Sequence, residues 1–374
     1  MPTYLTPDEL SRALAVRDLT DPAQGPHAAQ LLLDSVIRAL RTAWPAVAVR
    51  TVRTPPIVSI ADNYDLLGYD RADVTRDARY TRYLSPTTML RSHTSADIPA
   101  ILRGYSAAPD HDSIDDLLVL PGLVYRRDAV DRIHVGEPQQ VDLWRLRTES
   151  ACGGADLRAM VAHLVEAVLP GARWRMVPAR HPYTSGGHQL DVWRAGEWLE
   201  LAECGLIADR VLRGAGLDPS RWSGLALGMG LDRALMLRKG IPDIRYLRAD
   251  DERIAGQLGD LSPWRPVSAM PPVRRDLSVV VPDEADDETL GDAIRAALGE
   301  RADDIESIRV TARTRYADLP QRARTRLAMT PGQTNAVVRL VIRPLTRTLT
   351  RDQANALRNE VYRAIHIGPA LELA

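Results

Sequence analysis

The sequence stands out first for the residues it lacks. Its 374 residues include no phenylalanine, whereas a globular chain of this length ordinarily holds roughly a dozen or more. Leucine, valine, isoleucine and seven tryptophans must therefore fill the core volume that phenylalanine usually takes. Lysine is nearly absent as well: Lys239 is the only one, so 47 of the 48 basic residues are arginine. We interpret this bias as a mark of genome composition.

Cysteine and long apolar runs are also scarce, and each scarcity excludes a class of protein. Two cysteines, Cys152 and Cys204, are too few for a disulfide framework or a thiolate zinc site, and we expect both to be buried thiols. No apolar run is long enough for a membrane helix, and the N-terminus lacks the layout of a signal peptide, so we expect a cytoplasmic protein with no membrane segment. The net charge of -1 excludes a globally basic nucleic-acid binder, so any RNA contact must be local.

The length of the chain predicts two domains, or three, and its mixture of β-rich runs and helices predicts the α+β class. Residues 5–43 are predicted to be helical, with Thr6 as a cap before Pro7. The apolar face of that segment is expected to consist of Leu31, Leu32, Val36, Ile37 and Leu40. β-rich runs are expected at 118–126, 139–146, 187–202 and 223–228, and helices at 155–168 and 231–239.

A proline-rich break at 262–272 marks a domain boundary, and the pattern beyond it is βαββα. Its predicted elements are, in order, 277–281, 289–298, 308–310, 336–342 and 351–365. Thr350 and Gln353 form a capping-box pattern at the start of the last helix. We therefore expect a helical segment over 1–44, a main domain over 45–261 and a second domain over 262–374.

The stretch from Ser223 to Arg245 has the pattern of a phosphate-binding junction. A glycine-rich strand end leads directly into a helix, and we expect Gly224, Gly228 and Gly230 to let the backbone approach a ligand, with φ values that other residues avoid. The helix N-terminus adds free N–H groups and a positive dipole end, and Arg233 in its first turn adds a guanidinium. The alternative is an ordinary buried strand followed by an amphipathic helix.

A second polar stretch lies farther toward the N-terminus, between Val119 and Trp144. Its pattern predicts a strand, a loop and a returning strand, whose alternate side chains share one face. The polar side chains of this stretch are Arg126, Asp128, His134, Gln140 and Asp142. Together with Arg233 they offer cations for a polyphosphate, and carboxylate and amide groups for an amino group.

These two stretches resemble motifs 2 and 3 of class II aminoacyl-tRNA synthetases, and specifically those of the phenylalanyl-tRNA synthetase family. The resemblance continues in the family's order. Arg91–Ser95 (RSHTS) matches the HTS segment before motif 2, and His181–Val192 stands where the family has its FPF-containing segment. Trp198–Gly205 (WLELAECG) matches the strand that leads to motif 3, and Pro55 and Pro56 fall where motif 1 would lie.

The resemblance implies a class II antiparallel sheet flanked by helices, followed by a ferredoxin-like βαββα domain that binds the anticodon. Residues from Pro263 onward are similar to the start of that domain in the bacterial β subunit and in the single-chain mitochondrial enzyme. A chain with this domain order is expected to require no separate β subunit and to act as a monomer or homodimer. The implied reaction is activation of phenylalanine, or of a polar aromatic analogue, by ATP with Mg²⁺, followed by transfer to tRNA.

The family's ATP site can be carried over to the matching positions. Arg126 would hold the α-phosphate and the amino acid carboxylate, Arg233 the γ-phosphate, and His134 the outgoing pyrophosphate. Asp128 would contact the adenine amino group, and Glu200 would be the magnesium ligand. The expected ATP-binding residues are Arg126, Asp128, His134, Gly228, Gly230 and Arg233, of which Arg126, His134 and Arg233 are the expected catalytic residues.

The expected amino-acid site departs from the family pattern. Its residues are His93, Ser95, Gln140, Asp142, His181, Tyr183, Glu203 and Ala226. Gln140 and Asp142 would hold the substrate ammonium. The family's two phenylalanines become His181 and Tyr183, and a family glycine becomes Glu203. Because burying Glu203 without a partner would be costly, it must meet the substrate, meet a neighbour or reach solvent, and these polar groups favour a substrate with a polar side chain.

Arginines dominate the stretch from Ser307 to Arg351, which we predict to contact RNA, because each guanidinium can displace counterions from phosphate. The expected RNA-binding residues are Arg313, Arg315, Arg322, Arg324 and Arg326. The alternative is a solvated arginine-rich surface. Two other functions stay open at this point: a biosynthetic paralogue that delivers the activated amino acid to a non-tRNA acceptor, and a catalytically silent RNA-binding protein.

Overall fold

The computed structural model describes residues 4–107, 113–267 and 270–369, and within them the chain forms two compact units. The first unit contains residues 1–126, 137–241 and 256–264, and the second contains 127–136, 242–255 and 265–374. These units differ from the predicted boundaries after residues 44 and 261. The N-terminal helices belong to the first unit, while 127–136 and 242–255 join the second.

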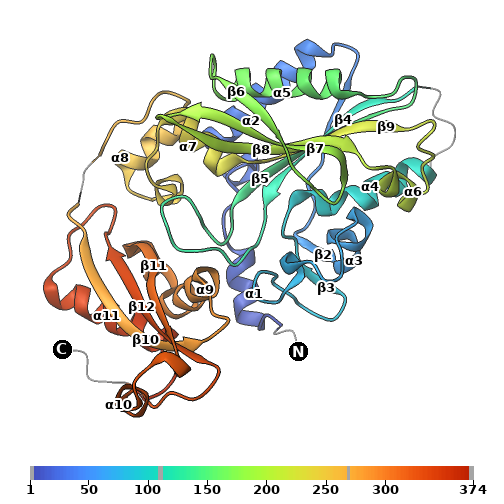
Figure 1. Cartoon of the computed structure of the whole chain (residues 1–374). Coiled ribbons are helices and arrows are strands. Elements are labelled where there is room, and N and C mark those ends of the chain that lie inside the picture. Colours follow the sequence, from blue (N-terminus) through green and yellow to red (C-terminus); the bar gives the residue numbers. More distant parts are fainter. Residues whose placement is uncertain (1–3, 108–112, 268–269, 370–374) are drawn as a thin grey trace. The chain divides into compact units, whose positions relative to one another are not determined.

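The first unit is built on a seven-stranded sheet in the order β1-β4-β5-β9-β8-β7-β6 (Figure 1). Its strands are β1 (Ala48–Thr51), β4 (Asp115–Leu123), β5 (Gln139–Arg147), β6 (Trp174–Pro178), β7 (Thr184–Arg194), β8 (Glu197–Ile207) and β9 (Ser223–Gly230). All neighbours are antiparallel except β1 and β4, which are parallel. The α+β class and the strands predicted around 118–126, 139–146 and 223–228 are thereby confirmed.

The predicted β-rich run at 187–202 is confirmed, and it lies in a hairpin of β7 and β8. Ala195 and Gly196 form its two-residue turn with φ values of 52° and 92°. Two positive φ values in succession match the twist of the flanking strands, which is why such turns are favoured in hairpins. Sequence reasoning missed the turn because alanine rarely adopts this conformation.

Helices α2 (Ala28–Ala43), α5 (Gly154–Val168) and α7 (Leu231–Lys239) pack together along one face of this sheet (Figure 1). The helices predicted at 155–168 and 231–239 are therefore confirmed as α5 and α7. In α2 the buried apolar face includes Leu33, whereas Leu31 is 39% exposed. The predicted apolar face is therefore wrong at Leu31. The buried face of α2 includes Leu33 instead, so it is rotated slightly from the predicted face.

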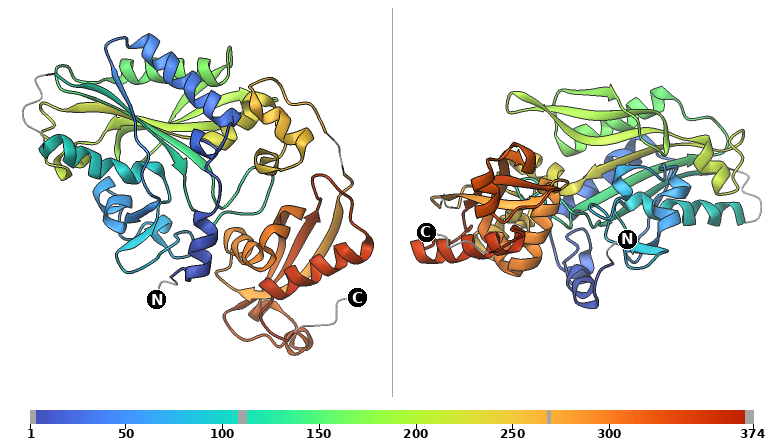
Figure 2. Two further views of the ribbon diagram at one scale, coloured as in Figure 1. Left: turned by 180° about the vertical axis from the view of Figure 1, so that it is seen from behind. Right: turned by 60° about the horizontal axis from the view of Figure 1, so that its bottom comes forward.

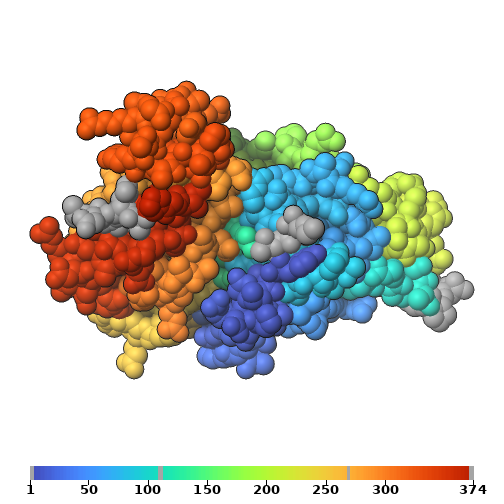
Figure 3. Space-filling model, turned by 90° about the horizontal axis from the view of Figure 1, so that it is seen from below, coloured from blue at the N-terminus to red at the C-terminus, as the bar shows by residue number. Residues whose placement is uncertain are grey.

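The predicted helical segment 5–43 is interrupted. Its first helix, α1 (Pro7–Leu14), begins at Thr6, which forms a capping box with Glu9. A short 3₁₀ turn at Pro22–Gln24 lies between α1 and α2. The residues at this end of the chain, blue in Figure 3, lie at the surface of the first unit.

The opposite face of the sheet is covered mainly by the chain between β1 and β4. This chain forms β2 (Ile57–Ser59), β3 (Thr88–Leu90), α3 (Ile60–Asn63), α4 (Ile98–Ala107) and a 3₁₀ turn at Thr94–Asp97, and α6 (Asp209–Gly214) packs nearby. Arg91 Nη1 and Asp97 Oδ2 form a buried ion pair at 3.0 Å, and Arg91 Nε donates to the Leu123 carbonyl at 2.8 Å. These contacts hold the segment that carries His93 and Ser95 against the sheet.

The second unit contains an antiparallel three-stranded sheet in the order β10-β12-β11 (Figure 2). Its elements are α8 (Glu252–Ala255), β10 (Val273–Pro282), α9 (Asp287–Leu298), β11 (Ile305–Arg315), α10 (Gln321–Arg326), β12 (Gln333–Ile342) and α11 (Arg351–Ile365). Apolar residues of α9 and α11 share one core with the sheet. The predicted βαββα order and the Thr350–Gln353 capping box are confirmed. The sequence GPALELA at 368–374 leaves a last ferredoxin-like strand doubtful, and residues 370–374 of it lie outside the described residues.

Residues 127–136 pack into this second unit through their backbone. Arg295 donates from its two Nη atoms to the carbonyls of Asp128 and Ala129, each at 2.6 Å. Val130 belongs to the core of the unit, and its carbonyl accepts a hydrogen bond from the backbone N–H of Ile308 at 2.9 Å. The segment is therefore a structural part of the unit that contains the three-stranded sheet.

Both cysteines, Cys152 and Cys204, are buried free thiols, as predicted. None of the helices in the described part of the chain has the length and apolarity that crossing a lipid bilayer requires.

We predict that Asp97→Ala destabilises the first unit, because it leaves the Arg91 charge buried without its partner. Removing one member of a buried ion pair costs about 3–5 kcal/mol in the free energy of unfolding, which urea denaturation would measure. The control is Asp209→Ala, which breaks an exposed ion pair with Arg213 and should change that free energy by less than about 0.5 kcal/mol. Equal effects of the two substitutions would show that the Arg91–Asp97 pair does not hold the segment.

Candidate active site

Three residues from neighbouring strands lie side by side on the face of the large sheet that faces the Thr94–Asp97 turn. Asp142 on β5 lies opposite Gly228 on β9, and Gly228 lies opposite Glu203 on β8. Residues directly opposite in antiparallel strands point to the same face, so two carboxylates flank a glycine. Since neighbouring strands lie about 4.8 Å apart, the Cα atoms of the two acids are separated by roughly 10 Å.

Gly228 leaves a space that three polar side chains surround. A Cβ atom placed on Gly228 would lie 3.4 Å from Gln140 Nε2, 3.6 Å from Asp142 Oδ1 and 3.8 Å from Tyr183 Oη. The carboxylate and the hydroxyl oxygen can accept hydrogen bonds from an ammonium group, which donates three, whereas the Gln140 Nε2 atom nearest this space is itself a donor. The structure thus brings Gln140 and Asp142 together, and it adds the Tyr183 hydroxyl to them.

Asp142 is buried and holds its orientation through side-chain hydrogen bonds. Thr94 Oγ1 donates to Oδ2 at 2.6 Å, and Trp144 Nε1 donates to Oδ1 at 3.3 Å. Burial raises the pKa of Asp142 to about 6, although hydrogen bonds from Thr94, Trp144 and Ser95 act in the opposite direction. The carboxylate is therefore ionised at neutral pH and titrates in mild acid.

His93 and Ser95 both lie beside this group, in the segment before α4. The Ser95 hydroxyl hydrogen-bonds with Asp142 and Tyr183. The His93 ring stacks on Tyr69, with ring centroids 5.5 Å apart and an interplanar angle of 11°. Burial lowers the pKa of His93 to about 3, so its imidazole is neutral.

Glu203 is paired with a neighbour, which resolves the alternatives that the sequence left open. Its Oε1 lies 3.3 Å from His181 Nε2, and its side chain is 46% exposed, whereas that of His181 is 7% exposed. Burial acts to raise the pKa of Glu203, but the hydrogen bond from His181 and the charges of His181 and Arg126 outweigh burial and lower it. Glu203 is therefore an anion at neutral pH.

Tyr183 and Trp144 form an aromatic pair beyond Gly228. Their ring centroids are 5.6 Å apart with an interplanar angle of 29°. Trp144 lies opposite Ala226, which lies opposite Gly205, so two small residues continue this row across the sheet. Gly205 is required there, because a Cβ atom on it would lie 2.6 Å from Thr184 Cβ.

The two arginines that we expect to bind phosphate each interact electrostatically with an acid on β8. Arg126 follows β4 and is exposed, and its Nε donates to the Ser92 carbonyl at 2.8 Å. Arg233 lies in the first turn of α7. Arg126 lowers the pKa of Glu203, and Arg233 acts in the same direction on Glu200, whose pKa burial and Glu203 nevertheless raise.

The glycines of β9 act differently from the expectation. None of Gly224, Gly228 and Gly230 has a positive φ. Gly224 is required by packing instead, because a Cβ atom on it would overlap the Arg145 carbonyl. Gly230 is the N-cap of α7 with a φ of -73°, and Gly228 provides the open space described above.

Two of the expected ATP ligands lie outside the first unit. Asp128 and His134 lie in the segment 127–136, which is part of the second unit. There the backbone of Asp128 is held by Arg295, and His134 Nδ1 lies 2.7 Å from Asp131 Oδ2.

The expected RNA-binding arginines lie on β11 and around α10. Arg313, Arg315, Arg322 and Arg326 are exposed. Arg324 is partly buried and structural, because it donates to the carbonyls of Leu319 and Ala317 at 2.7 Å each and stacks over Tyr316. Its guanidinium is thus already engaged in holding this turn.

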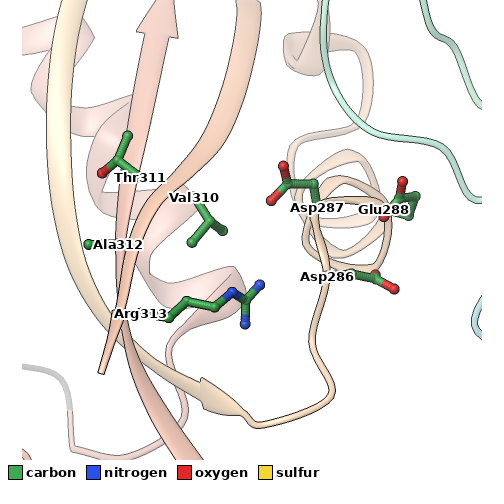
Figure 4. Close-up of a pocket in the computed structure, with 7 residues that line it drawn as sticks. All are labelled: Asp286, Asp287, Glu288, Val310, Thr311, Ala312 and Arg313. Carbon is green, nitrogen blue, oxygen red and sulfur yellow. The ribbon is translucent and has the colours of Figure 1, made fainter. Parts of the chain in front are cut away.

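Arg313 borders a hollow of about 520 Å³ between β11 and the start of α9. Figure 4 shows its guanidinium pointing across this hollow toward the start of α9, where the Asp287 side chain points back into the hollow and those of Asp286 and Glu288 point away from it. The three acidic residues at this end of the helix make the surroundings of Arg313 less favourable for a phosphate. Arg313 is therefore less suited to RNA than Arg315, Arg322 and Arg326.

Comparison with known proteins identifies the group to which this site belongs. Residues 19–258 match the family model described as tRNA synthetases class II core domain (F). The chain belongs to the phenylalanyl-tRNA synthetase family of class II ligases. The match covers both polar stretches of the site, from the Arg91 segment to Arg233, so the family and the geometry concern the same residues.

Curated relatives include alpha subunits of phenylalanine–tRNA ligases and ligases named as chloroplastic or mitochondrial. The phenylalanine–tRNA ligase alpha subunit of Prochlorococcus marinus (strain MIT 9313) is 34% identical over 64% of this chain and 69% of its own length. The chloroplastic/mitochondrial phenylalanine–tRNA ligase of Arabidopsis thaliana is 26% identical over 82% of this chain and 68% of its own length. Among solved structures, a pyrrolysyl tRNA synthetase of Desulfitobacterium hafniense has 18% identity and a TM-score of 0.45, covering 65% of this chain and 78% of that chain.

Sequence reasoning missed three side chains of the synthetase site. Tyr69 lies in a stretch with no motif, Thr94 was passed over between His93 and Ser95, and Trp144 has the ordinary pattern of a core residue. Trp144 carried one usable signal, since it follows Asp142 by two residues and must share its face of the strand. Tyr69 carried none, because only tertiary packing brings it to the sheet.

We predict that binding of the amino acid weakens as pH falls through about 6. Above this pH Asp142 is a carboxylate that pairs with the substrate ammonium, whereas below it the protonated group has lost that charge. KM for the amino acid in ATP–pyrophosphate exchange should rise about tenfold per pH unit below 6. Asp142→Asn should raise KM at every pH and remove this acid limb.

Groups near Asp142 change its pKa and therefore determine the pH at which binding of the amino acid weakens. Asp97 raises its pKa further after burial, and the Tyr69 and Tyr183 hydroxyls, both protonated, lie in the same group of side chains. An acid limb that survives in Asp142→Asn would assign the titration to one of the other groups, such as Glu203.

Proposed function

We propose that the chain activates an amino acid with ATP as an aminoacyl adenylate and transfers it to tRNA. The amino acid is phenylalanine or a polar aromatic analogue. The observation that carries this proposal is the gathering of Gln140, Asp142 and Tyr183 around Gly228, with Arg126 and Arg233 coupled to the adjacent strand β8. Relatives that are named phenylalanine–tRNA ligases support the same reaction.

The chemistry of activation explains why these groups are needed. The amino acid carboxylate attacks the α-phosphate in line, a new C–O–P linkage forms, and pyrophosphate leaves with the electrons of the broken P–O bond. Asp142 and Gln140 would hold the ammonium, so that the carboxylate points at the phosphate. Arg126 would hold the carboxylate and the α-phosphate, and Arg233 would neutralise the far end of the triphosphate.

Magnesium fits this site only as a partner of the nucleotide. In the described part of the chain no three His, Cys, Asp or Glu side chains gather as a metal site. Mg²⁺ ordinarily keeps several waters and binds through one or two carboxylates plus substrate phosphates, so a single exposed acid on β8 suffices. Glu200 would hold it, and the ion would supply neutralisation of the phosphate charge.

We predict that Arg126→Ala abolishes adenylate formation while leaving the fold intact. Arg126 is exposed, and its side chain contributes two hydrogen bonds, from Nε to the Ser92 carbonyl at 2.8 Å and from Nη2 to Gln140 Oε1 at 3.5 Å, so its loss removes little stability. A guanidinium that binds a transferring phosphate is a charge-assisted contact, and its removal should lower the rate of ATP–pyrophosphate exchange by about a hundredfold or more. Arg213→Ala, at an exposed arginine on α6, is the control. Normal exchange in Arg126→Ala would exclude the proposed phosphate site.

The acceptor and the assembly belong to the same proposal. Exposed arginines of the second unit support tRNA as the acceptor, because guanidinium groups displace counterions from an RNA backbone. Similarity to the chloroplastic/mitochondrial ligase of Arabidopsis thaliana, together with the resemblance to the single-chain mitochondrial enzyme, supports action without a separate β subunit. A cytoplasmic location and a monomeric or homodimeric state stay predictions from the sequence.

We predict that the double substitution Arg322→Ala/Arg326→Ala lowers kcat/KM for tRNA by roughly tenfold and leaves ATP–pyrophosphate exchange unchanged, since two phosphate contacts are lost. Aminoacylation of total tRNA at several salt concentrations would measure the effect, and the salt dependence should become shallower in the variant. The control is Arg213→Ala/Arg253→Ala. Exchange without any charging of tRNA by the unaltered protein would favour a non-tRNA acceptor.

A further inference from the structure

The face around Gly228 has two polar ends, and phenylalanine uses one of them. At the first end, Asp142 and its partners suit the α-ammonium that every amino acid carries. At the second end, on the next strand but one, Glu203 stands on the same face with His181 beside it. The two acids are therefore separated across the sheet by roughly the length of an aromatic amino acid.

Glu203 is able to accept a further hydrogen bond. His181 Nε2 approaches one carboxylate oxygen, Oε1, at 3.3 Å, while a carboxylate has about four acceptor positions on two oxygens. The side chain of Glu203 is 46% exposed, so solvent now reaches it. His181 is itself buried at 7% exposure, and it fixes the direction of the carboxylate.

Aromatic side chains border the space between these ends. Tyr69 stacks on His93, and Tyr183 stacks on Trp144. Both phenols lie close to both acids: burial raises the pKa of Tyr69 and Tyr183, and the charges of Asp142 and Glu203 raise each pKa further. Flat aromatic neighbours suit a ring, because offset or edge-on ring pairs are favourable beyond the area they bury.

An unsubstituted ring would be a poor fit between these groups. It would remove water from the Glu203 carboxylate without offering a hydrogen bond in return. A hydroxyl or amino group on the ring would donate to Glu203 instead. Sites built to pair with such a group reject the analogue that lacks it by as much as 10⁴-fold or more.

We propose that the site selects an aromatic amino acid whose ring carries a hydrogen-bond donor, a hydroxyl or an amino group, with Glu203 as the acceptor and His181 as the residue that positions it. This inference rests on the proposed activation of an amino acid. It assigns substrate specificity to two side chains that stand where the family has apolar or small residues.

The test is ATP–pyrophosphate exchange by the full chain with a panel of amino acids. The panel contains phenylalanine, its 3- and 4-hydroxy and 3- and 4-amino derivatives, and lysine as an aliphatic donor of similar reach. At least one ring-substituted amino acid should exceed phenylalanine in kcat/KM by about a hundredfold or more. A preference for phenylalanine or lysine overturns the inference and leaves the proposed function standing. Exchange with no member of the panel overturns the proposed function itself.

Substitutions then tie the preference to the named side chains. Glu203→Ala should reduce the preference for the best substituted ring over phenylalanine to within about tenfold, because the acceptor is gone. Glu203→Gln, which keeps an acceptor oxygen, should retain part of the preference. Glu197→Ala, at an exposed acid on the same strand, is the matched control and should keep the full preference.

A merely structural role for Glu203 would give a different pattern. In that case Glu203→Ala and Glu203→Gln would lower kcat/KM for phenylalanine and for the substituted rings by the same factor, and thermal unfolding would shift to lower temperature. That result overturns the inference. His181→Ala should weaken the preference less than Glu203→Ala, since it loosens the carboxylate without removing it.

Discussion

The antiparallel register of β5, β9 and β8 is the constraint on which the site depends. It places Asp142, Gly228 and Glu203 in one row, with the glycine between the two acids. Because side chains alternate between the faces of a strand, a slip of one residue in any of these pairings would turn an acid into the core beneath α5 and α7. The buried apolar residues on that opposite face therefore fix the register and, through it, the spacing of the acids.

Burying polar groups around Gly228 costs free energy, and hydrogen bonds from neighbouring residues offset this cost. Thr94, Ser95 and Trp144 supply hydrogen bonds to Asp142, and the Arg91–Asp97 pair anchors the segment that carries the first two. The stability of such buried groups depends on all of their hydrogen bonds together, because a group that loses its partner stays buried without a hydrogen bond. The side chains around Gly228 are therefore held in place before a ligand binds. They need not rearrange when they position a substrate ammonium.

Much of the fold was predictable from local patterns. The capping boxes at Thr6 and Thr350, the βαββα order of the second unit and the strands β4, β5 and β9 all follow from periodicity and end signals. The errors have local causes as well. The β7–β8 turn was hidden because Ala195 adopts a positive φ, and Leu31 was misplaced because a small rotation of an amphipathic helix exchanges neighbouring residues across its edge.

The sequence by itself determined the family, the two polar stretches and the pairing of Gln140 with Asp142, because these depend on residue types at short spacings along strands. Tertiary structure alone decided the contact of Glu203 with His181, the arrival of Tyr69 at the sheet and the inclusion of residues 127–136 in the second unit. Each of these joins parts of the chain that are distant in sequence. Their meeting depends on strand register and side-chain packing, which no local pattern specifies.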